Sequence, residues 1–188
     1  EHAKQIRRGF YALATHIDHQ IRSVIGLLRE LGILDNTILM FTSDHGNMLG
    51  NHGLLNIALF YEWCAKVPMI LVPTPTQVQE TGYGLLDDRL VAHADIMPTL
   101  LDLCGMEIPS SVEGISMVGE SNRDYIYGEF GENQMASRMV VDGTHKLIYY
   151  PVGNRIQCFD LKNDPNELHD LFPDGIDISI INRLVSVL

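Results

Sequence analysis

The chain has 188 residues, 46% of them hydrophobic, and a formal net charge of -11 at pH 7. This apolar fraction is ample for a packed core and fits one domain, or one core with a small subdomain. The acidic balance argues against nucleic-acid binding through a basic face, and an anionic ester would need local cations or a metal to bind.

A long amphipathic helix is predicted at the start of the sequence. Its apolar residues recur at steps of three and four, which places them on one stripe: Ile6, Phe10, Leu13, Ile17, Ile21, Val24, Leu28 and Leu31. Gly32 is well placed to end this helix. His16 and His19 can share a helical face, so a metal-binding interpretation can be built from them. We favour solvated or structural side chains at both positions.

Candidate metal-binding residues follow a short apolar run at residues 37–41, which indicates a buried strand. Asp44, His45 and Gly46 come directly after it, and Gly46 can take backbone angles closed to other residues. In an open α/β sheet, ligands bind at the carboxyl ends of the strands. A carboxylate oxygen and a neutral imidazole nitrogen are both good ligands for a divalent ion. For the dipeptide alone, a capping Asp44 and a solvated His45 would be the stronger interpretation.

The middle of the chain predicts further short elements. A short helix is expected to open at Tyr61, and residues 67–72 indicate a second buried strand. A polar surface loop at residues 74–88 and a short strand at residues 90–91 are expected to follow.

The residues at its two ends predict the next helix, between Asp95 and Gly105. Asp95 is placed to cap it, Pro98 is tolerated in its first turn, and Gly105 lies at its C-terminal end. Capping accounts for Asp95 without a metal, so we interpret Asp95 and the nearby His93 as structural.

The C-terminal third predicts a separate α+β unit beyond a connector at residues 108–121 that is rich in Pro, Ser and Gly. Four short β-like runs separated by turns indicate an antiparallel meander: residues 125–129, 138–141, 146–150 and 157–161. Residues 176–188 show helical spacing and are expected to pack against it. The side chains of this unit within conceivable reach of a substrate are Glu129, Glu132, Arg138 and His145. We favour solvated loop and sheet-edge positions for all four.

Six different short motifs follow one another along nearly the whole chain. They are Ser43-Asp44-His45-Gly46, Leu49-Gly50-Asn51-His52-Gly53, Tyr61-Glu62, Lys66-Val67-Pro68, Asp95-Ile96-Met97-Pro98-Thr99-Leu100-Leu101-Asp102 and Phe159-Asp160-Leu161-Lys162-Asn163-Asp164-Pro165-Asn166-Glu167-Leu168. This set resembles the sulfatase family of the alkaline-phosphatase-like superfamily, whose patterns have matching spacing. An ordered set of dispersed motifs is far more specific than any one of them.

The resemblance implies an α/β fold, namely a fragment of the alkaline-phosphatase-like sandwich with a C-terminal antiparallel β-meander and helix. Residues 1–115 would be the C-terminal part of the sulfatase α/β core, and residues 122–188 a small α+β subdomain. The first helix would pack on the sheet, with Asp18 as a structural acid.

The resemblance also implies a sulfuric-ester hydrolase that acts on a small sulfate ester. Asp44 and His45 would ligate a divalent ion, with Ca²⁺ expected and Mn²⁺ or Zn²⁺ as the alternative. His52 would lie at the rim of the site as a catalytic residue that binds the ester or donates a proton. A loop histidine bonded to backbone is an equally weighted interpretation of His52.

Part of that active site is missing from the sequence. The family's nucleophile is a formylglycine made from a Cys or Ser in a C/S-x-P/A-x-R motif, and none of Cys64, Cys104 and Cys158 has that context. The acidic pair that completes the metal site is not visible either. We therefore expect the nucleophile and further ligands in a missing N-terminal part of the same protein, and the chain alone to be inactive.

Ile57 departs from the family pattern, which has a Lys at this position, 13 residues after Asp44. That Lys would contact the sulfate oxygens, and its loss could cost about 10²–10³ in rate by analogy with oxyanion-hole deletions. Lys66 occupies another motif position and is not assigned to catalysis. Two alternatives stay open: a phosphate or phosphonate ester hydrolase using Mn²⁺ or Zn²⁺, compatible with His45, and a non-catalytic binding protein on a sulfatase scaffold, supported by Ile57.

The cysteines and the hydropathy pattern say little about the compartment. The three cysteines form neither a disulfide framework nor a zinc pattern, so we expect three small buried side chains. No apolar run is long enough to span a bilayer. The compartment, cytoplasmic or periplasmic or secreted, and the natural substrate stay open.

Overall fold

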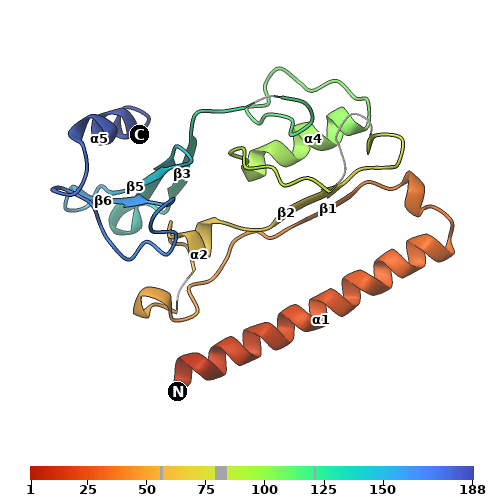
Figure 1. The fold of residues 1–188 in the computed structure, drawn as a ribbon, viewed down its shortest axis with the longest axis horizontal. Helices are drawn as coiled ribbons and strands as arrows, with labels where there is room; N and C mark the ends of the chain where they lie inside the picture. Colours follow the sequence, from red (N-terminus) through yellow and green to blue (C-terminus); the bar gives the residue numbers. More distant parts are fainter. Residues whose placement is uncertain (56, 79–83, 121) are drawn as a thin grey trace.

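The computed structural model describes residues 1–55, 57–78, 84–120 and 122–188. A long N-terminal helix is followed by a region with a two-stranded sheet and short helices, and then by a four-stranded sheet with a C-terminal helix (Figure 1). This arrangement confirms the predicted α/β class and the predicted C-terminal antiparallel meander.

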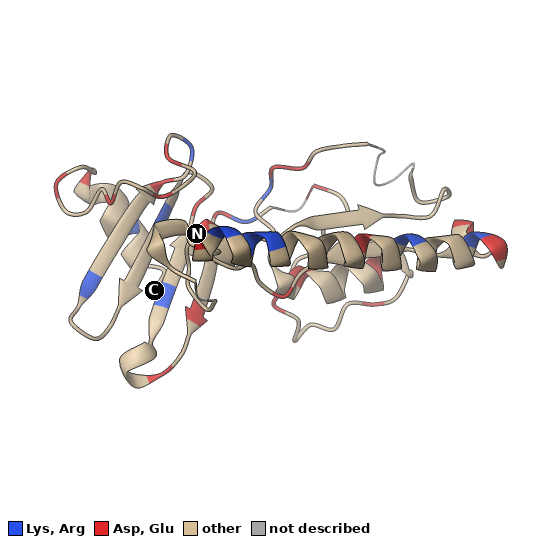
Figure 2. Cartoon of the chain, turned by 90° about the horizontal axis from the view of Figure 1, so that it is seen from below, with Lys and Arg blue, Asp and Glu red and all other residues tan. Residues whose placement is uncertain are grey.

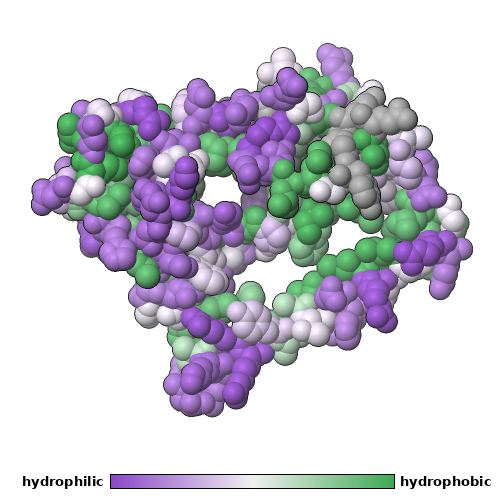
Figure 3. Space-filling model, viewed as in Figure 1, coloured by the Kyte–Doolittle hydropathy of each residue, from purple (hydrophilic) through white to green (hydrophobic). Residues whose placement is uncertain are grey.

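Helix α1 spans His2–Glu30, and Gly32 follows it with a left-handed φ of 69°. The predicted helix and its end are therefore confirmed. None of its residues is buried, and Leu13 and Ile17 on the apolar stripe are 64% and 54% exposed. The space-filling view shows apolar side chains along the side of α1 that faces the two-stranded sheet, with the two surfaces apart over most of the helix (Figure 3). The expectation that this helix packs on the sheet is thus wrong for the described residues, because most of its apolar stripe lies apart from the sheet (Figure 3).

The two-stranded sheet pairs β1 (Leu39–Thr42) with β2 (Met69–Val72) in antiparallel register. Both strands occur where the sequence predicts them. Their predicted burial is wrong, since Phe41 is 40% and Ile70 52% exposed. A two-stranded ribbon offers few neighbours to cover its faces.

Short helices and turns complete this region. They are η1 (Leu34–Asn36), η2 (Asn51–Gly53), α2 (Glu62–Ala65), η3 (His93–Asp95) and α4 (Ile96–Leu103). Helix α4 ends at Leu103, and Gly105 follows its C-terminal cap with a φ of 66°, as the sequence predicts. The strand expected at residues 90–91 is absent from this described segment. The side chain of the preceding residue, Arg89, donates instead to the carbonyl oxygens of Met117 and Gly119, at 3.0 and 2.7 Å. Side-chain hydrogen bonds rather than strand pairing therefore hold this part of the chain.

All three cysteines are free thiols. Cys64 and Cys158 are buried as predicted, and burial raises the pKa of Cys158 to about 12. The prediction is wrong for Cys104, which is exposed because it lies at the C-terminal cap of α4.

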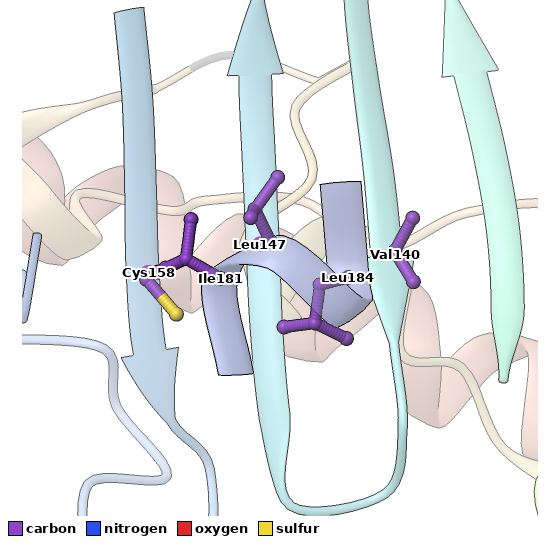
Figure 4. Close-up of a cluster of buried hydrophobic side chains, with 5 residues drawn as sticks. All are labelled: Val140, Leu147, Cys158, Ile181 and Leu184. Atoms are coloured by element: carbon purple, nitrogen blue, oxygen red, sulfur yellow. The ribbon is translucent and has the colours of Figure 1, made fainter. Parts of the chain in front are cut away.

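The C-terminal sheet has the strand order β3-β4-β5-β6 with every neighbouring pair antiparallel. Its strands are β3 (Ile126–Phe130), β4 (Ser137–Val141), β5 (His145–Tyr150) and β6 (Arg155–Asp160), with η4 (Asn133–Met135) between β3 and β4. Helix α5 (Ile178–Val185) lies on this sheet. Its Ile181 and Leu184 meet Val140, Leu147 and Cys158 in a buried core (Figure 4).

A charged contact fixes α5 to the turn between β4 and β5. Arg183 Nη2 lies 2.5 Å from Asp142 Oδ2. Burial alone would raise the pKa of Asp142, but bonds from the His145 backbone N–H and the Arg183 guanidinium hold that pKa below its usual range.

In the part of the chain that the structure describes, no helix is long and apolar enough to cross a membrane.

Candidate functional site

Asp44 and His45 lie directly after β1, on an exposed turn. The Asp44 carboxylate, 83% exposed, accepts a hydrogen bond from the His45 backbone N–H at 2.8 Å and one from the Ser43 hydroxyl at 3.3 Å. The bond from the His45 N–H, followed by the charge of the His45 ring, lowers the pKa of Asp44. The carboxylate is therefore ionised at neutral pH and open to solvent.

The His45 ring is oriented by its own loop. Its Nδ1 lies 2.8 Å from the Gly46 carbonyl oxygen, and since a carbonyl only accepts, Nδ1 carries the proton. In the neutral ring Nε2 then presents its lone pair, 3.6 Å from Asp44 Oδ2. A ring N–H bonded to a backbone carbonyl, with the other nitrogen left for a cation, is the pattern usual for metal-ligating histidines.

These two donors do not complete a coordination shell. Among the described residues, no group of three or more His, Cys, Asp and Glu side chains could hold a metal ion. Asp44 and His45 fit a divalent ion as a partial ligand set, and their exposure leaves room for ligands from elsewhere.

Two neighbouring elements hold this turn in place. His93 Nε2 lies 2.8 Å from the Ser43 carbonyl oxygen, in keeping with the structural role expected for His93. The Gly46 N–H donates to the Cys64 carbonyl at 2.8 Å, and a Cβ at Gly46 would lie 2.0 Å from the Trp63 carbonyl oxygen. Gly46 does not take the unusual φ that the sequence suggested. It is required for the close approach to α2 instead.

His52 lies in η2 with a left-handed φ of 53°. Its Nε2 is 3.0 Å from the Asn166 carbonyl oxygen, and its ring stacks on Tyr61 with centroids 4.3 Å apart at 18°. The backbone-bonded histidine that the sequence left open is therefore observed, although Nδ1 is not engaged by that bond.

Arg7 anchors the same loop from the other side. It belongs to the basic N-terminal part of α1 (Figure 2). Its Nε donates to the Leu49 carbonyl at 2.7 Å and its Nη2 to Asn51 Oδ1 at 3.2 Å. The loop with His52 is thus held between α1 and the C-terminal part of the chain.

A buried charged cluster, which we call the Lys146 cluster, joins α2 to the C-terminal sheet. It consists of Lys146 on β5, Glu62 on α2 and Glu167 in the loop after β6. The fully buried Lys146 Nζ lies 2.5 Å from Glu62 Oε1 and 2.8 Å from Glu167 Oε1, and Glu167 Oε2 accepts the Glu62 backbone N–H at 2.6 Å. Burial raises the pKa of Glu167, against the opposing effect of Lys146. The sequence analysis missed this cluster, since the two Glu residues appeared only as letters of motifs and Lys146 only as a strand residue.

An open groove of about 200 Å³ lies beside the Lys146 cluster. It is lined by Glu62, Trp63, Lys66, Pro165 and Asn166. The Lys66 side chain is 79% exposed there, and its Nζ lies 3.8 Å from Glu62 Oε2. Ile57, where the family pattern has a Lys, is 39% exposed.

Asp95 is structural, by a different route from the one predicted. Its side chain makes no capping bond to α4. The buried carboxylate accepts the backbone N–H groups of Ala92 and Ile115, at 2.7 and 2.8 Å, and pairs with Arg123. It therefore ties the connector to the start of α4.

The remaining candidates have local roles. His16, Asp18 and His19 are exposed on α1. In the C-terminal sheet, Glu129 accepts the Tyr127 hydroxyl at 2.9 Å, and His145 Nδ1 lies 3.7 Å from Asp142. Glu132 and Arg138 are exposed.

Comparison with known proteins gives consistent results. The Sulfatase family model matches residues 1–106. An arylsulfatase of Clostridium perfringens is 38% identical over 174 residues, which cover 89% of this chain and 36% of that protein.

Solved structures share the fold. BT4656, solved in complex with its substrate D-glucosamine-2-N,6-O-disulfate, aligns with a TM-score of 0.83 at 26% identity, over 93% of this chain and 38% of that chain. A phosphonate monoester hydrolase from Silicibacter pomeroyi aligns with a TM-score of 0.78 at 26% identity, also over 93% of this chain and 38% of that chain. The chain thus spans little more than a third of the proteins that it matches.

Proposed function

The chain belongs to the sulfatase family, whose members are sulfuric-ester hydrolases, and we propose that it forms part of such an enzyme. Its substrate is a small sulfate ester. Asp44 and His45 bind the divalent ion, with Ca²⁺ as the expected ion, and His52 contacts the ester. The observation that carries this proposal is the pair of donor atoms, 3.6 Å apart, directly after β1.

A divalent ion bound there would polarise the ester and orient it for attack. Asp44 offers an ionised carboxylate, and His45 offers Nε2 because Nδ1 is bonded to Gly46. His52 binds the ester or donates a proton to it. A formylglycine nucleophile and the further ligands belong to the N-terminal part of the protein, which also covers the exposed apolar faces of α1 and the β1–β2 sheet.

The metal-binding half of the proposal is tested with Mn²⁺ as a paramagnetic probe. Small additions should broaden the backbone NMR signals of Asp44 and His45, excess Ca²⁺ should restore them, and Asp44→Asn should abolish the effect. The chain provides a matched pair in Asp164 and His169, whose Oδ2 and Nδ1 lie 3.4 Å apart. Asp164→Asn should leave the broadening at His45 unchanged. Equal broadening at both pairs would show that the ion does not select the Asp44–His45 pair.

The hydrolase half is tested on the protein as its source makes it. Its intact mass should exceed that of this chain, and its peptides should include a formylglycine within a C/S-x-P/A-x-R segment. The 188-residue chain alone should not turn over an aryl sulfate. Turnover by the chain alone would contradict the division of the active site proposed here.

Two other functions are each favoured by one observation. The similarity to a phosphonate monoester hydrolase, together with His45 as a ligand that suits Mn²⁺ or Zn²⁺, favours a phosphate or phosphonate ester hydrolase. Ile57 at the usual Lys position favours a non-catalytic binding protein. A preference for Mn²⁺ or Zn²⁺ over Ca²⁺ would support the first, and a full-length protein without the nucleophile motif would support the second.

A further inference from the structure

We propose that strands β5 and β6 of the C-terminal sheet position His52, fixing its ring plane and its Nε2–H tautomer so that Nδ1 is the nitrogen that meets a ligand. Gln157, Lys146 and Glu167 are then positioning residues. The proposal deepens the proposed function, since it specifies how His52 is prepared for an ester.

The tautomer follows from the partner of Nε2. The Asn166 carbonyl oxygen, 3.0 Å away, can only accept a hydrogen bond, so Nε2 is the donor. In a neutral imidazole the other nitrogen then holds the lone pair. His52 therefore accepts through Nδ1 when neutral and donates through Nδ1–H when protonated.

The ring plane is set by Tyr61, and Tyr61 is held by β6. The two rings stack at 4.3 Å, and the Tyr61 hydroxyl donates to Gln157 Oε1 at 3.2 Å. The Tyr61 ring also contacts Phe159, with centroids 5.9 Å apart. Gln157 and Phe159 both belong to β6, so the orientation of His52 depends on this strand.

The Asn166 carbonyl is set by Glu167, and Glu167 is held by β5. The two residues share one peptide unit, and Glu167 is 2% exposed with a left-handed φ of 56°. Its carboxylate is bound by Lys146 and by the Glu62 backbone N–H, at 2.8 and 2.6 Å. An unpaired buried charge is costly, so the Lys146 cluster fixes the position of the peptide unit.

The test is the imidazole N–H spectrum of the 188-residue chain, measured by NMR at alkaline pH, where its eight histidines are neutral. His52→Gln identifies the signal. We expect a protected Nε2–H signal for His52 in the natural chain, its loss in Glu167→Ala, and its retention in Glu167→Gln, which keeps the shape and an acceptor. Arg183→Ala breaks the ion pair with Asp142, which belongs to the same C-terminal part of the chain but does not touch His52. This variant should keep the signal.

An Nδ1–H tautomer in the natural chain would overturn the proposal without any variant. So would an unchanged signal in folded Glu167→Ala, or an equal loss in Arg183→Ala. If Glu167→Ala does not fold, Gln157→Leu serves, because loosening the Tyr61 stack should shift the His52 ring-proton signals, and no shift would contradict the role of β6. These signals need no turnover. A failed sulfatase assay of the full-length protein would therefore refute the proposed function without affecting the positioning result.

Discussion

At the scale of single residues, the Lys146 cluster is the most consequential feature that the sequence concealed. A fully buried ammonium is shared by two carboxylates, one from α2 and one from the loop after β6. Removing one partner of a buried ion pair leaves an uncompensated charge, which is more costly than losing an exposed pair. The cluster therefore joins α2 to the C-terminal sheet through charge.

Lys146→Met should lower the free energy of unfolding by about 3–5 kcal/mol at neutral pH, because it leaves buried Glu167 without its cation. Denaturant unfolding measures this. Lys162→Met is the matched control, since Lys162 is exposed, and it should stay within about 0.5 kcal/mol of the natural chain. Similar losses in both variants would show that Lys146 contributes only its aliphatic part.

Glu167 should give stability a specific pH dependence. Because burial raises its pKa above the ordinary 4.5, the folded chain holds this proton more tightly than the unfolded chain. The free energy of unfolding should therefore fall as pH rises from 4.5 through the folded-state pKa. Unfolding across this range should show that fall in the natural chain and a smaller one in Glu167→Gln. Exposed Glu107→Gln should match the natural chain, and equal slopes in all three would refute the assignment.

Gly46→Ala should destabilise the chain by about 1–3 kcal/mol, as overpacking does. Its Cβ would meet a backbone oxygen at 2.0 Å, and that atom cannot rotate away. Thermal unfolding and the NMR signals of Asp44 and His45 measure the effect. Gly9→Ala is the control, because a Cβ there meets nothing and alanine favours a helix interior by about 0.5–1 kcal/mol. Unperturbed signals in Gly46→Ala would mean that the turn is free to move.

At the scale of elements, docking of α5 completes the core of the C-terminal sheet. Ile181 and Leu184 face three strands, whereas Ile178 at the start of the same helix is 64% exposed. One apolar stripe thus contains both core and surface residues. Only the sheet decides which of them are buried.

Ile181→Ala should lower the free energy of unfolding by about 2–5 kcal/mol, because it leaves a cavity between α5 and the sheet. Ile178→Ala changes the same side chain at an exposed position and should cost less than about 1 kcal/mol. Denaturant unfolding of the two variants gives a direct comparison. Equal costs would mean that α5 is not docked as described.

At the scale of the whole molecule, α1 exposes an apolar stripe that the described residues leave uncovered. Leu13, Ile17 and Val24 are 64%, 54% and 59% exposed. Contiguous apolar surface of this kind marks an interaction site. The exposed face of the β1–β2 sheet has the same character, which agrees with a chain that spans little more than a third of its relatives.

Replacing Leu13, Ile17 and Val24 together by Gln should reduce binding of an apolar dye and self-association. It should not lower the free energy of unfolding, because these side chains are exposed. Dye fluorescence, light scattering and denaturant unfolding measure the three effects. Leu184→Gln, in the core, should instead lower stability and raise dye binding. Loss of stability in the triple variant would show that the stripe is already packed in this chain.

Local sequence patterns were enough to locate most of the helices and strands and to identify the family. The recurrence of apolar residues at steps of three and four located α1, and turn residues between β-like runs located the C-terminal meander, because these signals are local. The order of the motifs identified the family without any contact being known. Asp44 and His45 were selected by residue type and by their place after a strand, and their role remains a prediction.

Which surfaces are buried and which distant residues meet could be learned only from the folded chain. Strands β1 and β2 have the composition of buried strands yet are half exposed, since burial depends on a covering layer that a local pattern does not contain. The bond of His52 to Asn166 spans 114 positions, and that of Lys146 to Glu62 spans 84. Such pairs leave no periodic signal, because each partner satisfies its local pattern equally well with or without the other.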